Sequence, residues 1–255
     1  METLEYNIDY FNRGEAQNVR FWSRFDAKPA FEGLAVLDIG CGHGRLCVEM
    51  ARAGARRVVG VDVKPNLIEF AADNVRTNYP DLAGKIEFLP VDLKDFAPDA
   101  AFDIIVSKET FEHLVDLPGV LAEMKGRLKP GGRVYAGFGP LWKSPIGDHR
   151  LGHFILPWGH LMFPRRVLFR RVSRSWGRNI ESVHDMGLNG LSFAEYVRII
   201  RASGFTTPYF AVNRGGHPVL KLLSLARKIP FLREYCTVNV YCILERISEH
   251  PSTLP

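Results

Sequence analysis

Three glycines at alternate positions follow a short apolar run. The run is Val36-Leu37-Asp38-Ile39, the glycines are Gly40, Gly42 and Gly44, and a helical pattern begins at Arg45. Glycine adopts positive φ without strain and lets a ligand approach the main chain closely. The helix that follows directs unpaired N–H groups and the positive end of its dipole toward whatever lies over the turn. A strand, a glycine turn and a helix in this order predict a site for a small molecule with a negatively charged group.

The glycine spacing argues against a nicotinamide dehydrogenase. The dinucleotide fingerprint G-x-G-x-x-G, counted from Gly40, requires a glycine at position 45, and the chain has Arg45 there. A second apolar run, residues 57–61, ends in Asp62. A carboxylate at the end of the next strand, roughly twenty residues beyond the glycines, can accept hydrogen bonds from both hydroxyls of a ribose. These residues predict a ligand that contains a ribose.

The segment Asp38-Ile-Gly-Cys-Gly-His-Gly44 resembles the first motif of the class I S-adenosylmethionine (SAM) dependent methyltransferases. The resemblance implies that Asp62 binds the ribose, that Asp92 binds the adenine amino group, and that the N–H of Leu93 meets the ring. It implies SAM as the cofactor and S-adenosylhomocysteine as its product. The cofactor-binding residues implied in this way are Asp38, Gly40, Cys41, Gly42, Gly44, Asp62, Val63, Asp92, Leu93 and Ser107.

Two later segments carry the same resemblance. Residues 102–107 read as a fourth strand, and the following Glu112-His113 is similar to the acid–histidine pair of the family's fourth motif. The turn Leu128-Lys-Pro-Gly-Gly132 is a further hallmark of the family. In this family the position of His113 more often shapes the pocket behind the cofactor, so His113 is the third choice for a catalytic base.

The resemblance implies one α/β domain over residues 1–255. We expect a Rossmann-like, seven-stranded, mostly parallel sheet of order 3-2-1-4-5-7-6, with helices on both faces and an antiparallel seventh strand. The right-handed crossover rule places the ends of the first four strands at one edge, where ligands of open α/β sheets bind. Strand six is expected at 209–212 and strand seven at 237–244.

Three segments lie outside this minimal fold. Residues 1–32 are expected to be helical from about 5 to 28, either as a lid whose Tyr10 or Arg20 touches the cofactor or as a helix that only packs on the sheet. Two insertions, 140–189 and 213–233, leave the sheet at the edge where the methyl group should lie. By position and by resemblance, we assign both insertions to the methyl acceptor.

The first insertion contains the preferred catalytic candidates. Removing the proton of a hydroxyl acceptor requires a base, and histidine is suited to this near neutral pH. His149 is the first choice and His153 the second, with Asp148 beside His149 to orient its ring. The alternative is a structural histidine bonded to a loop carbonyl. A metal site would require a helix here, which Gly147 and Gly152 oppose, so no metal is predicted.

Both insertions are basic and amphipathic. Arg166, Arg170 and Arg174 share one helical face, and residues 219–228 combine lysine and arginine with leucine. One interpretation is a helix that packs its apolar side and solvates its charges. The other is peripheral contact with anionic lipid headgroups or with a lipid-linked acceptor. Nucleic acid is disfavoured because no RNA-binding appendage is recognisable.

Composition is that of an ordinary globular protein. The 255 residues are 46% hydrophobic and 24% charged, and the net charge of +5 permits an anionic partner without requiring one. The four cysteines form no C-x-x-C pair, so we expect reduced thiols in a cytoplasmic protein. No signal peptide is recognisable, and no apolar run approaches the roughly 18 residues of a membrane span.

The sequence thus predicts a SAM-dependent methyltransferase with a histidine base. Its acceptor is expected to be a small or lipid-linked hydroxylated molecule, such as a glycoside or a secondary metabolite. Two alternatives stay open. The enzyme methylates nitrogen or carbon, where less help from a base is needed, or the protein binds SAM without transferring a methyl group and serves to associate with membranes.

Overall fold

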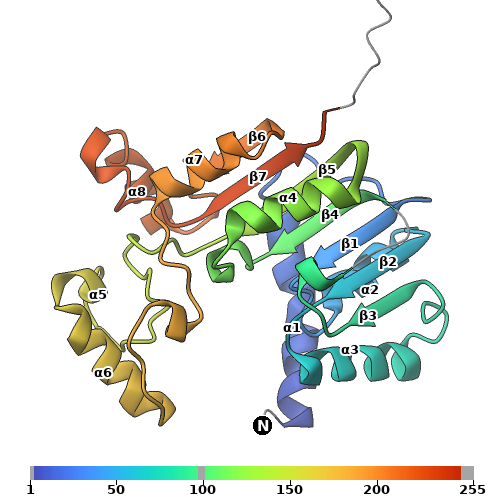
Figure 1. Ribbon diagram of the computed structural model, residues 1–255, viewed down its shortest axis with the longest axis horizontal. Coiled ribbons are helices and arrows are strands. Elements are labelled where there is room, and N and C mark those ends of the chain that lie inside the picture. Colours follow the sequence, from blue (N-terminus) through green and yellow to red (C-terminus); the bar gives the residue numbers. More distant parts are fainter. Residues whose placement is uncertain (1–2, 97–100, 248–255) are drawn as a thin grey trace, which may run out of the picture.

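A computed structural model describes residues 3–96 and 101–247, which build one twisted sheet covered on both faces (Figure 1). The sheet order is β3-β2-β1-β4-β5-β7-β6, as predicted. β3, β2, β1, β4 and β5 are mutually parallel, and β7 runs antiparallel to both β5 and β6. The strands are β1 (Ala35–Ile39), β2 (Arg57–Val61), β3 (Ile86–Leu89), β4 (Phe102–Lys108), β5 (Leu128–Phe138), β6 (Thr206–Val212) and β7 (Val240–Glu245).

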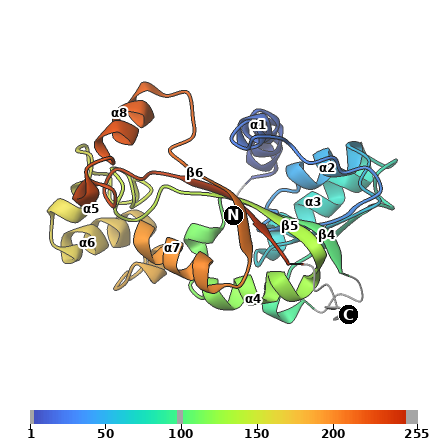
Figure 2. The ribbon, with the colours of Figure 1, turned by 90° about the horizontal axis from the view of Figure 1, so that it is seen from above.

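Two helical layers enclose the sheet (Figure 2). The α-helices are α1 (Leu4–Trp22), α2 (Arg45–Arg52), α3 (Pro65–Asn78), α4 (Leu117–Arg127), α5 (Gly159–Met162), α6 (Arg165–Trp176), α7 (Phe193–Ala202) and α8 (Pro218–Ala226). Short 3-10 turns are η1 (Leu93–Asp95), η2 (Phe111–His113), η3 (His184–Met186) and η4 (Pro230–Leu232). α1, α2 and α3 lie on one face of the sheet, and α4 and α7 lie on the other.

The alternation of side chains along the strands divides the core between these layers. In β1, Val36 joins the cluster under α1 and α2, whereas Leu37 joins the cluster under α4 and α7. All five residues of β1 are buried because both faces of a parallel sheet are covered by helices. α7 begins with a capping box, in which the side chains of Ser192 and Glu195 accept from each other's main-chain N–H groups.

Three predicted boundaries move. The first helix ends at Trp22 rather than near residue 28, and the Ser23 hydroxyl donates to the Arg20 carbonyl at 2.9 Å there. β6 begins three residues early, at Thr206, and β7 begins three residues late, at Val240. Both differences follow from pairing at the sheet edge: Thr206 pairs with Glu245, and Val240 pairs with Phe138.

The first insertion has a small core of its own. Trp142, Leu168, Val172 and Met186 are buried together, away from the two sheet clusters. α6 therefore packs one apolar side inward while Arg166 and its other arginines are exposed. Within the described ranges, no helix is both long and apolar enough to cross a bilayer.

Candidate active site

The glycine turn joins β1 to α2 with three residues in left-handed conformation. The φ angles of Gly40, Gly42 and Gly44 are 75°, 51° and 78°. A Cβ on Gly44 would lie 2.6 Å from the Phe88 ring, so packing beneath the turn requires glycine there. A Cβ on Gly42 would meet nothing within 4 Å. The main chain at Gly42 therefore faces open space, as a backbone that a ligand approaches must do.

Two acidic residues follow neighbouring strands at this edge of the sheet. Asp62 lies after β2 and accepts hydrogen bonds from the N–H groups of Gly42 and Lys64, each at 3.0 Å. Asp92 lies beyond β3 and accepts from the N–H of Lys94 at 3.2 Å. These bonds fix both half-buried carboxylates, and each oxygen keeps acceptor capacity for a hydroxyl or an amino group.

Asp38 differs from these two acids. It lies within β1, is 2% exposed, and accepts a hydrogen bond from the Cys47 thiol at 3.3 Å. Burial raises its pKa to about 6, against the lowering effects of Cys47 and Lys108. Asp38 therefore supports the glycine turn from below, and its contact with the cofactor stays a prediction. Of the neighbouring candidates, Val63 is exposed and Leu93 is buried.

The end of β4 and helix α1 complete this edge. The Ser107 hydroxyl is buried and has no hydrogen-bond partner among the described residues. Lys108 next to it donates to the Asn18 side chain of α1 at 2.8 Å. Tyr10 of α1 stacks on His43 of the glycine turn, with ring centroids 4.5 Å apart. α1 thus lies against the turn where a lid would lie, and the lid function stays a prediction.

Two of the three predicted histidines meet at the ends of β4 and β5. The rings of His113 and His149 pack edge to face, with centroids 5.5 Å apart. His113 Nδ1 lies 2.6 Å from the Gly187 carbonyl oxygen, and His149 Nε2 lies 3.2 Å from that of Pro140. Because a carbonyl only accepts, these nitrogens carry the protons. His113 Nε2 and His149 Nδ1 are then the nitrogens able to accept a proton.

His149 is electrically neutral at neutral pH. Burial and the nearby His113 together lower its pKa to about 4, and the Pro140 carbonyl and Asp148 oppose this shift. A neutral imidazole of low basicity can take a proton only while a strong electrophile pulls on the acceptor oxygen.

The expected pairing of Asp148 with His149 is wrong. The Asp148 carboxylate accepts from the N–H groups of Arg150 and Gly152, at 3.3 and 3.0 Å, and lies 3.7 Å from Nδ1 of His160. His160 Nε2 in turn donates to the Trp142 carbonyl at 2.7 Å. The chain reverses at His149, whose φ is 53°, so Asp148 holds the loop rather than the catalytic ring.

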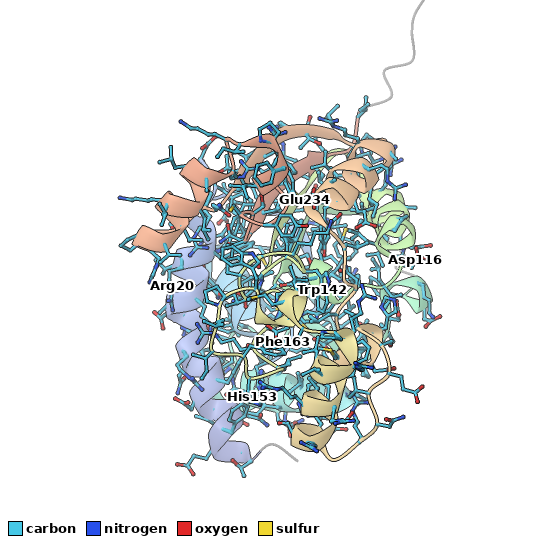
Figure 3. All side chains as sticks on the ribbon, turned by 90° about the vertical axis from the view of Figure 1, so that its left-hand side faces the viewer. Arg20, Asp116, Trp142, His153, Phe163 and Glu234 are labelled. Carbon is cyan, nitrogen blue, oxygen red and sulfur yellow. The ribbon has the colours of Figure 1, made fainter. Side chains whose placement is uncertain are left out.

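His153 lies apart from the pair. Its Nε2 is 3.4 Å from the Ser175 hydroxyl of α6, and the side chain is exposed (Figure 3). His149 and His153 both have positive φ, so no helix brings them onto one face. In the described part of the chain, no three histidine, cysteine or acidic side chains are grouped as a metal site requires. His153 as a base stays a prediction.

Comparison with known proteins supplies the family. Residues 36–132 match the model of the family described as "Methyltransferase domain". The predicted resemblance to SAM-dependent methyltransferases is thereby confirmed over residues 36–132.

Curated relatives match the same part of the chain. A ubiquinone biosynthesis O-methyltransferase of Rhodopseudomonas palustris (strain TIE-1) is 33% identical over 142 residues, which cover 49% of this chain and 54% of the relative. A ribosomal protein L11 methyltransferase of Burkholderia lata is 34% identical over 113 residues, covering 44% of this chain and 33% of the relative. The chain thus spans about half the length, or less, of these relatives.

Solved structures show the same fold. A putative S-adenosylmethionine dependent methyltransferase from Listeria monocytogenes superposes with a TM-score of 0.61 at 15% identity, covering 90% of this chain and 99% of that one. The magnesium protoporphyrin IX methyltransferase of Synechocystis PCC 6803, crystallised with bound SAH, gives a TM-score of 0.55 at 16% identity, with 96% and 88% covered. The predicted Rossmann-like architecture of the methyltransferase domain is confirmed.

One polar residue of the methyltransferase domain was not among the predicted site residues. Glu112 is 3% exposed; one carboxyl oxygen accepts from the Gly139 N–H at 3.0 Å, and the other has no partner within the described ranges. Burial raises its pKa to about 8, so it is protonated at neutral pH. The sequence signal was its place beside His113, but its burial follows from packing between β4 and β5.

Proposed function

We propose that this protein is a SAM-dependent methyltransferase that methylates a hydroxyl group of a small or lipid-linked acceptor. The His113–His149 pair is the observation that carries the proposal. It supplies two ring nitrogens that can each accept a proton. They lie at the ends of β4 and β5, on the edge of the sheet where the glycine turn lies. The similarity to a ubiquinone biosynthesis O-methyltransferase supports oxygen as the methylated atom.

The residues at the edge fit the cofactor. The open side of Gly42 leaves room for it, Asp62 and Asp92 offer acceptors for ribose and adenine, and the Ser107 hydroxyl offers an unused polar group. Bound SAM supplies a methyl group on a positively charged sulfonium. Because the electrophile is already activated, the protein's task is to position the acceptor and exclude water.

The chain's own contribution to chemistry is the handling of one proton. The acceptor hydroxyl would pass its proton to His149 Nδ1 or to His113 Nε2 as it accepts the methyl group, whose bond to the sulfonium sulfur would break to leave neutral S-adenosylhomocysteine. The carbonyls of Pro140 and Gly187 hold the two rings in the tautomers this requires. Burial of the His149 side chain lowers its pKa and so favours the neutral form of that imidazole.

Two experiments test the proposal in turn. Calorimetry with SAM measures cofactor binding, and transfer of a radiolabelled methyl group to a panel of phenols, glycosides and amines identifies the acceptor class. With the best acceptor, His113→Ala and His149→Ala are expected to lower kcat by about 10²–10⁴-fold, with unchanged SAM affinity.

His153→Ala is the matched control and is expected to keep its turnover. Full turnover in both pair variants would exclude the proposed base. Turnover on amines alone would point to N-methylation, the second predicted reaction. SAM binding without transfer to any acceptor would favour the third alternative, a binding protein.

A further inference from the structure

Large apolar side chains of the two insertions are uncovered on the outside of the molecule. Ile155 is 99% exposed and Phe231 is 71% exposed. We call the following six residues the apolar surface: Ile155, Leu156, Phe163, Leu222, Leu225 and Phe231. Single exposed apolar residues are ordinary, but a group of this size drawn from neighbouring segments marks an interaction surface.

Two contacts connect the first insertion to the residues that directly follow the second. The Trp158 indole N–H donates to the Tyr235 carbonyl at 3.1 Å, and the Lys143 ammonium lies 3.7 Å from the Glu234 carboxylate. Figure 3 views this face and shows α5, α6 and α8 with Phe163 near its centre. The two parts of the apolar surface therefore belong to one side of the molecule.

Helix α8 exposes a row of aliphatic side chains on its outer side. Leu223 is its one buried residue, whereas Val219, Leu222 and Leu225 are between half and two-thirds exposed. The spacing of three residues aligns these side chains along one stripe of the helix. A short helix with this much uncovered aliphatic surface gains stability when an apolar phase covers the stripe.

Charge is segregated onto the same two segments. Residues 149–180 contain seven arginines and no acidic residue, and residues 214–233 contain five lysines and arginines and no acidic residue. None of these twelve side chains forms an ion pair with a described residue. The whole chain has a net charge of +5, so the rest of it is net negative.

The positive charge around the apolar surface distinguishes between its possible binding partners. A second copy of the chain would bring two strongly positive faces together, which Coulomb repulsion opposes. A nucleic acid would neutralise the charge but would leave the leucines and Phe231 without an apolar partner. An anionic bilayer satisfies both requirements, because headgroups meet the basic side chains and acyl chains meet the apolar ones.

We propose that the apolar surface inserts into the interfacial layer of an anionic lipid bilayer, with the basic residues of 149–180 and 214–233 on its headgroups. The edge of the sheet that carries His149 then faces the membrane, and an acceptor held in the bilayer can reach it without leaving the lipid. Membrane docking does not depend on which atom the enzyme methylates.

Vesicle co-sedimentation of the full chain tests this docking. Phosphatidylcholine vesicles with phosphatidylglycerol are expected to bind the protein, whereas phosphatidylcholine vesicles alone are not. The double variant Lys221→Glu/Lys228→Glu and the triple variant Leu222→Ser/Leu225→Ser/Phe231→Ser are each expected to lower the partition coefficient by about tenfold or more. High salt is expected to weaken binding of the wild-type protein.

The double variant Lys85→Glu/Arg198→Glu changes exposed charges on other surfaces and is expected to bind nearly as the wild type does. SAM affinity by calorimetry verifies that every variant is folded. Equal binding by all variants, or no binding to anionic vesicles, would overturn the proposal. A dimer in ultracentrifugation that only the triple variant abolishes would assign the surface to self-association instead.

Discussion

His113 and His149 lie with their rings edge to face, 5.5 Å between centroids, although one follows β4 and the other lies in the insertion after β5. Each ring is held by a different main-chain carbonyl, of Gly187 and of Pro140. The pair therefore depends on three loops meeting at the sheet edge. Its geometry leads to a prediction about pH.

If His149 takes the proton, activity will persist under mildly acidic conditions. Its pKa of about 4 keeps the ring in the basic form above about pH 5, whereas a histidine of ordinary pKa, 6.5, would already be protonated. We expect kcat/KM for a hydroxyl acceptor to stay level from pH 8 down to about pH 5 and then to fall. A decline within this range that disappears in His113→Gln would assign the proton to His113.

Asp148 is expected to support the loop and not the chemistry. Asp148→Ala leaves the buried N–H of Gly152 without its acceptor, which should lower the free energy of unfolding by about 1–3 kcal/mol. Urea unfolding measures the loss. At a temperature where the variant is folded, the acid limb of its pH–rate profile should move toward lower pH, because the Asp148 charge raises the His149 pKa. A loss of turnover at every pH in the folded variant would show that Asp148 takes part in the chemistry.

Glu112 is expected to make stability fall as pH rises. Its pKa is about 8 in the folded chain and 4.5 ordinarily, so between these values the folded state binds more protons than the unfolded state. Stability is then full below pH 4.5 and declines up to about pH 8, by on the order of a few kcal/mol. Glu112→Gln imitates the protonated acid, so it should stabilise the protein more at pH 9 than at pH 5.

Thermal unfolding at both pH values measures this difference. The exposed Glu69→Gln serves as the control and should keep the pH dependence of the wild type. An identical pH dependence in Glu112→Gln would mean that Glu112 is ionised in the folded protein.

The glycine turn separates folding from cofactor binding. Gly44→Ala places a Cβ against the Phe88 ring in a left-handed conformation and should cost about 1–3 kcal/mol of stability. Gly42→Ala meets no protein atom within 4 Å, so it should cost only about 1 kcal/mol but weaken SAM binding about tenfold or more, since its Cβ occupies the cofactor's side of the turn.

Unfolding curves and SAM titrations of the same samples compare the two effects. Gly84→Ala, which has open space around it and no positive φ, is the control. Normal SAM affinity in Gly42→Ala would contradict the prediction that the cofactor binds against the glycine turn.

The sequence by itself determined the sheet and its cofactor edge. Apolar runs ending in Asp62 and Asp92, and glycines after residues 36–39, are local patterns, and the handedness of crossovers turns them into one edge. The ends of the edge strands were harder to predict from the sequence. The first residues of β6 and β7 each differ by three positions from the prediction, because pairing with the neighbouring strand sets where each one begins.

Only the tertiary structure decided which side chains meet. Asp148 and His149 are adjacent in the chain, yet the Asp148 carboxylate accepts from the N–H groups of Arg150 and Gly152 while the His149 ring bonds the Pro140 carbonyl. His113 and His149 are distant in the chain, yet the loops after β4 and β5 bring their rings together. Tertiary packing also decided which side chains are buried. It buries Glu112 and leaves the apolar side chains along one side of α8 exposed. Loops follow no periodic pattern, so their contacts come from long-range packing that a linear sequence does not display.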